Sequence, residues 1–353
     1  MHWAKVRPHA RFNLVSSGAP DLTLADLPPL DVAPELTSPH AYGYPPLLEA
    51  IAARYGAKAE NVVTATGTSM ANHLAMAALI EPGDDVLMEW PGYEPLVATA
   101  RFLGASLHFF ARAPERGFAV DADEVARLVT PKTRLIVLTN PHNPSGAFTD
   151  DDTLRRIGDA ADRAGARVLI DEAYLDVVPA ARSAFLLHPN FVATSSLAKS
   201  YGLSGLRCGW ILADEETARR IWRLYDLFEA SPVHWAEQLS CALFPHLDPL
   251  LERTRGLVAH NRRTLHALYD RARGVEGIRN GEGSIAFPKL LHGNVEELCK
   301  LLLERYEMAV APGHFFGRDD HFRIGLARDP EMFKEALKRL EAALEELRRA
   351  PGA

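Results

Sequence analysis

Cysteine is scarce in this chain, which has three cysteines among 353 residues. Cys208, Cys241 and Cys299 are odd in number, far apart and outside any metal-ligand spacing. This argues against a disulfide framework and against a thiolate metal site. The pattern is typical of reduced, buried thiols in a cytoplasmic protein.

The chain also lacks long apolar runs and an excess of positive charge. No stretch approaches the roughly 20 apolar residues that span a bilayer, and residues 1–20 hold no continuous apolar segment for export. The formal net charge is −7, with acidic and basic residues interspersed, which argues against general nucleic-acid binding and against a polybasic membrane contact. We therefore expect a cytoplasmic protein whose partners are small or zwitterionic molecules, with no nucleic acid and no membrane among them.

What the chain has is a repeating alternation of strand and helix patterns. With 47% hydrophobic and 24% charged residues, it can bury a large core and is long enough for two domains. Near-continuous apolar strands joined by helices predict an α/β fold with a mostly parallel sheet covered on both faces. Beyond residue 215 the pattern becomes helical and ends in a smaller mixed region. The predicted strands are 61–66, 85–90, 106–111, 134–139, 167–171 and 191–196.

Unusual residues follow these predicted strands. In open parallel sheets, ligands bind beyond the carboxyl ends of the strands. The residues at or just beyond those ends, each after a different strand, are Gly67, Tyr93, Asn143, Asp171 and Lys199. The sequence therefore predicts a ligand site along this edge of the sheet.

Asp171 ends one apolar strand, and Lys199 follows the next. A buried carboxylate needs a cationic partner, although an Asp at this place is also a common cap for the following helix. Together with Tyr174, these two residues supply what one cofactor requires. Pyridoxal phosphate has an aldehyde that a lysine can hold covalently, a ring nitrogen whose proton a carboxylate can retain, and a phenolic oxygen. The set favours pyridoxal 5′-phosphate as the cofactor.

The phosphate of that cofactor has candidate ligands as well. Backbone N–H groups at a helix start bind phosphate, and the stretch TGTSMANHLA offers such a start. A Gly-Thr-Ser run alone is weak evidence for phosphate binding. Two further groups lie near Lys199 in the sequence: the hydroxyl group of Ser196 shortly before it, and the planar guanidinium group of Arg207 after it. The candidate phosphate ligands are Gly67, Thr68, Ser69, Ser196 and Arg207.

Four motifs together resemble one known family. They occur in the order and roughly the spacing of the class I/II aminotransferases, which are fold-type I pyridoxal-phosphate enzymes, and the resemblance runs from about Asn13 to Ala327. It implies a three-layer α/β/α large domain with a mostly parallel seven-stranded sheet, plus a smaller α+β domain. The motifs are NPHNPSG (140–146), DEAY (171–174), SSLAKSYGLSGLRCGW (195–210) and FRIGLA (322–327).

The expected division has three parts. Residues 1–40 form an amino-terminal segment that contributes to the small domain and to the active site. Residues 41–255 form the large cofactor-binding domain, and residues 256–353 form the small carboxyl-terminal domain.

The resemblance also implies roles around the cofactor ring. Lys199 is similar to the lysine that binds the cofactor covalently and then acts as the base, and Asp171 to the partner of the ring nitrogen. Asn143 and Tyr174 resemble the pair that hydrogen-bonds the phenolic oxygen. Tyr93 looks like the aromatic residue that stacks on the ring. Lys199, Asp171 and Tyr174 are thus the expected catalytic residues.

Substrate binding and the dimer are implied less directly. Arg323 resembles the arginine that grips the substrate α-carboxylate, and Gly18 lies near the same group. In the family a tyrosine normally reaches the phosphate of the neighbouring subunit in a homodimer. The stretch HAYGYPPLLEAIA is shorter here than usual, so Tyr42 is the candidate and Tyr44 the alternative.

The function that the resemblance implies is an aminotransferase that exchanges an amino group between an amino acid and a 2-oxo acid by a ping-pong mechanism. A C–S lyase or an amino-acid decarboxylase would share Lys199, Asp171 and Arg207. The stretch GLSGLRCGW also resembles the histidinol-phosphate branch of the family. A non-catalytic binding module is disfavoured, because the motifs begin near Asn13 and both Lys199 and Arg323 are present.

Overall fold

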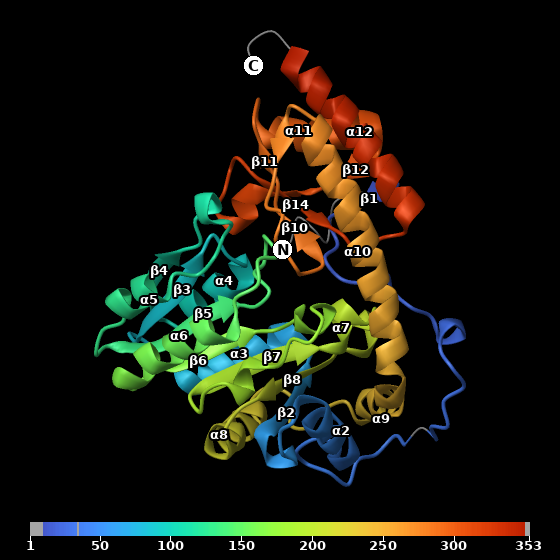
Figure 1. The fold of residues 1–353 in the computed structure, drawn as a ribbon. Coiled ribbons are helices and arrows are strands. Elements are labelled where there is room, and N and C mark those ends of the chain that lie inside the picture. The colour runs from blue at the N-terminus through green and yellow to red at the C-terminus, as the bar shows by residue number, and fades with distance from the viewer. Residues whose placement is uncertain (1–9, 34, 350–353) are drawn as a thin grey trace.

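The computed structural model describes residues 10–33 and 35–349, and its centre is a seven-stranded sheet (Figure 1). All strands run in one direction except β8, which is antiparallel to both of its neighbours. The mostly parallel α/β sheet predicted from the sequence is therefore confirmed. The strand order is β2 (Val62–Thr66), β8 (Cys208–Leu212), β7 (Phe191–Ser196), β6 (Arg167–Asp171), β5 (Thr133–Thr139), β3 (Asp85–Trp90) and β4 (Ser106–Ala111).

Helices cover both faces of the sheet, which gives three layers (Figure 1). Side chains alternate along each strand, so Leu135 and Val137 of β5 face one apolar core while Ile136 and Leu138 face the other. The first core is closed by α3 (Thr68–Leu79), α4 (Glu94–Phe102) and α8 (Glu215–Tyr225). The second is closed by α5 (Ala122–Leu128) and α6 (Asp151–Arg163), and a neighbouring core by α2 (Pro45–Tyr55) and α9 (His234–Leu243).

A second structured region follows the sheet. The long helix α10 (Leu247–Arg271) leads into it, and α11 (Val295–Tyr306) and α12 (Pro330–Arg349) pack around one further apolar core. The expected boundary between residues 255 and 256 falls inside α10, and the division into domains stays a prediction. The short strands there are β9 (Val275–Glu276), β10 (Ile285–Ala286), β11 (Lys289–Leu290), β12 (Met308–Ala309), β13 (Ala311–Pro312) and β14 (Phe322–Gly325).

The amino-terminal segment joins this second region to the sheet edge. Strand β1 (Phe12–Asn13) pairs in parallel with β12, and Gly325 N donates to Leu14 O at 2.8 Å. A Cβ atom on Gly325 would stand 1.9 Å from Ser16 O, so only glycine lets the two segments lie this close. Residues 14–19 are thereby held beside the carboxyl ends of the central strands.

The remaining helical pieces are short. Among the described residues no helix is long and apolar enough to cross a membrane. The three cysteines form no disulfide bond, and Cys208 is buried as expected, whereas Cys241 and Cys299 are only half-buried because they lie on helix faces that reach the surface. The short pieces are α7 (Leu197–Ser200) and 3-10 turns at Leu24–Asp26, Ala59–Asn61, Pro114–Arg116, Leu175–Val177, Ala184–Leu186, Ser204–Leu206, Phe244–His246 and Gly313–Phe316.

Candidate active site

A cavity of about 470 Å³ opens at the carboxyl ends of the parallel strands. This is the edge at which the sequence predicts a ligand site, and the volume is in the range of cofactor and small-ligand pockets. The predicted site residues that line it are Gly18, Thr68, Ser69, Tyr93, Asn143, Asp171, Tyr174, Ser196, Lys199 and Arg207.

Lys199 lies in the single turn of helix that follows β7. Burial, together with the nearby Arg323 guanidinium, lowers the pKa of its amine to about 8, against the opposing effect of the Asp171 carboxylate. A Cβ on Gly18 would stand 3.3 Å from the Lys199 side chain, so Gly18 leaves room for the lysine. The result is an amine that can lose its proton near neutral pH.

Asp171 ends β6 and is held from two sides. Ala173 N donates to one of its oxygens at 3.0 Å, and Asn72 Nδ2 donates to the other at 2.8 Å. Thr194 Oγ1 donates to Asn72 Oδ1 at 2.6 Å and so turns the Asn72 amide toward Asp171. Burial raises the pKa of Asp171, while these two hydrogen bonds and Lys199 pull the pKa down. The donors therefore favour the carboxylate form at a buried place.

The start of α3 and the Arg207 side chain form a cradle for an anion. Gly67 precedes the helix with a φ of 79°, and a Cβ there would meet Arg207 Nη2 at 2.2 Å. Gly209 is packed as tightly, since its Cβ would stand 2.5 Å from the Gly67 backbone. Arg207 Nη2 donates to Thr66 O at 3.1 Å, and Thr68 Oγ1 donates to Ser196 Oγ at 2.8 Å. Glycine at both positions lets the guanidinium lie beside the helix start.

Tyr93, Tyr174 and Asn143 line the same cavity as Lys199. Tyr174 OH donates to Ser17 Oγ at 2.9 Å, which ties the segment after β6 to the amino-terminal segment. Tyr93 is the residue that precedes α4 and lines the cavity. Arg323 Nη1 donates to Asn143 Oδ1 at 3.0 Å. The predicted ring-binding residues are therefore brought together.

Arg323, the predicted carboxylate ligand, is buried on β14. Besides Asn143 it donates to Val15 O at 3.1 Å, and its guanidinium carbon lies 4.8 Å from the centre of the Phe316 ring. These contacts fix the guanidinium plane next to the cavity. A fixed fork orients a carboxylate as well as attracting it.

Tyr42 lies apart from the cavity of its own chain. It is 45% exposed, packs against Trp222 at a centroid distance of 5.6 Å, and its OH donates to Asp226 at 3.2 Å. Its expected contact with a neighbouring subunit stays a prediction.

Comparisons with known proteins agree with this geometry. Residues 33–340 match the family model of the class I and II aminotransferases. Capreomycidine synthase of Streptomyces vinaceus is 33% identical, over 90% of this chain and 86% of its own length. A PLP-dependent aminotransferase from Streptococcus suis superimposes with a TM-score of 0.89 at 26% identity, covering 98% and 96% of the two chains. The PLP-dependent cyclase OrfR gives 0.86 at 26% identity with the same coverage.

The chain belongs to the class I and II aminotransferases. It is a pyridoxal-phosphate-dependent transferase, and the predicted fold-type I architecture is confirmed. The amino group that it moves passes between an amino acid and a 2-oxo acid.

The residues of this aminotransferase fit its cofactor. The free N–H groups of the first turn of α3, with Arg207, suit the phosphate. The held carboxylate of Asp171 suits a protonated ring nitrogen, and the buried amine of Lys199 suits an aldehyde.

Sequence reasoning missed several supporting residues of the aminotransferase site. Asn72 holds Asp171, Thr139 lines the cavity, and Ser17 binds Tyr174. Asn72 had a signal, because it is a polar residue that shares its face of α3 with the apolar Ala75 and Met76. Thr139 had one too, as the last residue of a strand whose carboxyl end was expected to face a ligand.

The pKa of Lys199 predicts how the enzyme takes up its cofactor. Only the neutral amine attacks an aldehyde, so the reconstitution rate of cofactor-free protein with pyridoxal phosphate rises about tenfold per pH unit up to about pH 8 and then levels off. Stopped-flow absorbance measures this rate. A lysine with the usual pKa of 10.5 would instead keep accelerating well above pH 9, and that profile would contradict the assigned environment.

Proposed function

We propose that Lys199 is the covalent and proton-transferring residue of this aminotransferase, that Asp171 is the partner of the cofactor ring nitrogen, and that Arg323 binds the substrate α-carboxylate. The observation that carries the proposal is the Lys199 amine in the cavity, near the Asp171 carboxylate and the guanidinium groups of Arg323, Arg207 and Arg328. Its depressed pKa, near 8, lets it accept and return a proton at physiological pH.

The chain's own groups divide the work of binding and proton transfer. Arg323, fixed by Asn143 and Val15, orients the substrate so that its α-carbon faces Lys199. Lys199 Nζ then removes the α-proton. Pyridoxal phosphate, when bound, takes up the amino group and stabilises negative charge on carbon. Asp171 holds the positive charge that this stabilisation requires.

The overall exchange balances without any other reactant. An amino acid becomes its 2-oxo acid, and a second 2-oxo acid becomes its amino acid, so two half-reactions share one site. Every substrate of both half-reactions carries a carboxylate next to the reacting carbon, and Arg323 binds that carboxylate in each case. We therefore infer ping-pong kinetics.

A panel of donors and acceptors tests the proposed exchange. Purified holoenzyme is incubated with acidic, aromatic or basic amino acids and with 2-oxoglutarate or pyruvate, and the products are identified by mass spectrometry. Parallel lines in double-reciprocal plots and a new amino acid derived from the oxo acid are expected. Ammonia released with no new amino acid formed would point to a lyase, and carbon dioxide would point to a decarboxylase. Either result would overturn exchange as the main activity.

A second candidate is a ring-forming reaction on an amino acid. It is favoured by one specific observation, the likeness over 98% of the chain to the PLP-dependent cyclase OrfR. Such a reaction can begin with the same proton removal by Lys199. A cyclic amino acid formed from the donor alone, with no oxo acid consumed, would support it in the same assay.

We also infer that the enzyme works as a homodimer in the cytoplasm. Large apolar side chains gather where α8 ends and α9 begins, and such exposed clusters mark protein interfaces. The lack of disulfide bonds among the cysteines of the described residues suits a reducing compartment. Sedimentation equilibrium tests the dimer, and a monomer at micromolar concentration would contradict it. The exposed residues are Tyr42, Leu227, Phe228, Val233 and Trp235.

A further inference from the structure

A buried ion pair lies beneath the site and takes no part in the functions assigned so far. Arg112 Nη1 and Glu89 Oε2 are 2.7 Å apart, with the two residues 0% and 3% exposed. Arg112 Nε also donates to Phe118 O at 2.5 Å. Removing two charges from water is costly, and an apolar pair of the same volume often stabilises a fold as well. The pair therefore calls for an explanation beyond stability.

The other oxygen of Glu89 faces the site. Thr139 donates to Glu89 Oε1 twice, from its backbone N at 2.8 Å and from Oγ1 at 2.6 Å. A hydroxyl group has one proton, so once it points to Glu89 the oxygen can only accept from other partners. Asn143 N is that partner, at 2.8 Å from Thr139 Oγ1. Because of Glu89, the Thr139 hydroxyl donates its proton to Glu89 and accepts the hydrogen bond from Asn143 N.

The same direction continues to the substrate-binding arginine. Arg323 can only donate, so it requires the oxygen of the Asn143 amide, and Asn143 Oδ1 accepts from it at 3.0 Å. The NH₂ group of Asn143 therefore points away from Arg323, and Asn143 itself lines the cavity. Every hydrogen bond from Arg323 through Asn143 and Thr139 therefore points toward the carboxylate of Glu89.

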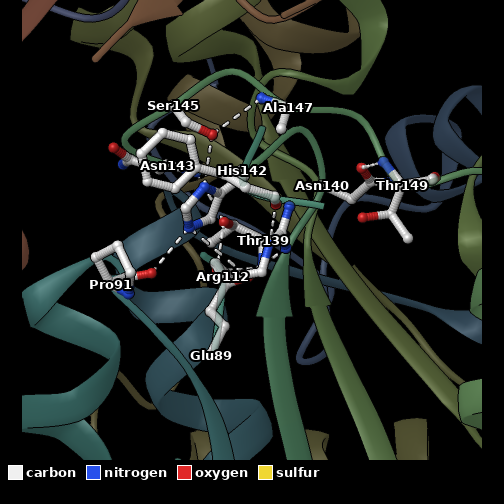
Figure 2. A network of polar contacts seen from close by, with 11 residues as sticks. Glu89, Pro91, Arg112, Thr139, Asn140, His142, Asn143, Ser145, Ala147 and Thr149 are labelled. Carbon is white, nitrogen blue, oxygen red and sulfur yellow. Dashed lines mark hydrogen bonds and ion pairs between the residues drawn. The ribbon is translucent and has the colours of Figure 1, made fainter. Parts of the chain in front are cut away.

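A second contact fixes the turn that carries Asn143 (Figure 2). His142 is fully buried, and this burial holds the pKa of its ring well below the usual range, so the ring is neutral. A carbonyl oxygen only accepts, hence Nε2 donates to Pro91 O at 2.9 Å, and Nδ1 accepts from Ser145 Oγ at 2.7 Å. The turn is thereby tied to the segment that leads to Tyr93.

We propose that Glu89, charge-balanced by Arg112, is a positioning residue that fixes Asn143 through the Thr139 hydroxyl and so sets the orientation of Arg323. The inference rests on the proposed roles of Asn143 and Arg323. It makes the core beneath β3 and β5 a determinant of carboxylate binding, although neither Glu89 nor Arg112 lines the cavity.

Thr139 offers the sharpest test. Glu89→Gln would leave the Arg112 charge buried without its counter-ion and threatens the fold. Thr139→Val keeps the shape and removes only the hydroxyl, while Thr139→Ser keeps the hydroxyl. Thr149→Val is a matched control. Thr149 is a buried threonine in the segment between β5 and α6, and its Oγ1 has no hydrogen-bond partner among the described residues.

The measurements are KM and kcat for the donor, the dissociation constant of a non-reacting carboxylate that has the side chain of the donor but no amino group, and the pH midpoint of the cofactor absorbance. We expect Thr139→Val to weaken carboxylate binding and raise KM by about tenfold, the order expected for one lost charge-linked hydrogen bond. The absorbance midpoint should move as well, since the proposed role of Asn143 is to bind the phenolic oxygen of the ring. Thr139→Ser and Thr149→Val should stay within about twofold of the wild type.

Two results would overturn the positioning role. One is Thr139→Val with wild-type affinity and an unmoved absorbance midpoint. The other is equal losses in Thr139→Val and Thr149→Val, which would indicate a general packing effect. Failure of the proposed function is seen separately, because the carboxylate affinity and the cofactor absorbance can still be measured in a wild-type enzyme that exchanges no amino group.

Discussion

Lys199→Ala is expected to lower kcat for amino-group exchange by about 10⁴-fold or more, because both a covalent and a proton-transferring group are lost. The cofactor should still bind through the cradle at α3 and Arg207, but without a covalent link. Borohydride reduction followed by peptide mass spectrometry measures that link directly. It should mark the Lys199 peptide in the wild type and no peptide in the variant.

Misfolding is an alternative cause of such a loss and can be separated from it. Burial disfavours the protonated form of Lys199, whose pKa falls from 10.5 to about 8, so the folded chain gives up stability to hold this amine at neutral pH. The cofactor-free variant should therefore unfold at a temperature no lower than that of the wild type. Lys132→Ala, at an exposed lysine before β5, is the control. A Lys199→Ala enzyme that still carries a reducible link at another lysine would contradict the assignment.

Sequence periodicity placed the strands well because each is a short apolar run. The predicted strands 85–90, 106–111, 167–171 and 191–196 agree with the observed bounds, and β5 begins one residue earlier than expected, at Thr133. The seventh strand, β8, is not among the predicted strands. Its first residues, Cys208 and Gly209, stand at the end of the motif SSLAKSYGLSGLRCGW, which predicts a cofactor site and not a strand.

The reason lies in a contact that no local pattern contains. Gly209 is needed because its Cβ would collide with the backbone of Gly67, which is more than 140 residues away in the chain. Gly202, in the same motif, is needed for a different reason, because its φ of 75° lies in the left-handed region that favours glycine. Two glycines of one motif thus have different roles. The role of Gly209 can be recognised only from the pairing of β2 with β8.

The candidate site shows the same limit. Lys199, Asp171 and Arg207 could be predicted because their chemistry is rare at strand ends and fits one cofactor. Asn72 could not be assigned, since its task depends on Thr194 turning the amide across from β7. Hydrogen-bond direction is a property of the assembled neighbours, and the sequence alone does not supply it.

Asp171→Asn should lower kcat by about 10³-fold while the cofactor remains bound. Each unit by which a carboxylate raises the pKa of the ring nitrogen contributes about 1.4 kcal/mol to holding its proton, and a few units change the stability of the charged carbon by orders of magnitude. An amide carries no charge and supplies none of this. The rate of the first half-reaction, followed by cofactor absorbance after mixing with a donor, measures the loss.

The geometry around Asp171 makes this variant more than a loss of charge. Both carboxylate oxygens of Asp171 accept hydrogen bonds, one from Ala173 N and one from Asn72 Nδ2. An asparagine side chain has an NH₂ group in place of one oxygen, so this group, itself a donor, would lie against one of the two N–H donors. The introduced amide is left with a strained contact, and the ring nitrogen loses a fixed acceptor. Asp162→Asn, at an exposed carboxylate near the end of α6, controls for the substitution itself. Should Asp171→Asn keep its half-reaction rate within tenfold of the wild type, the positive charge of the ring must be held by another group.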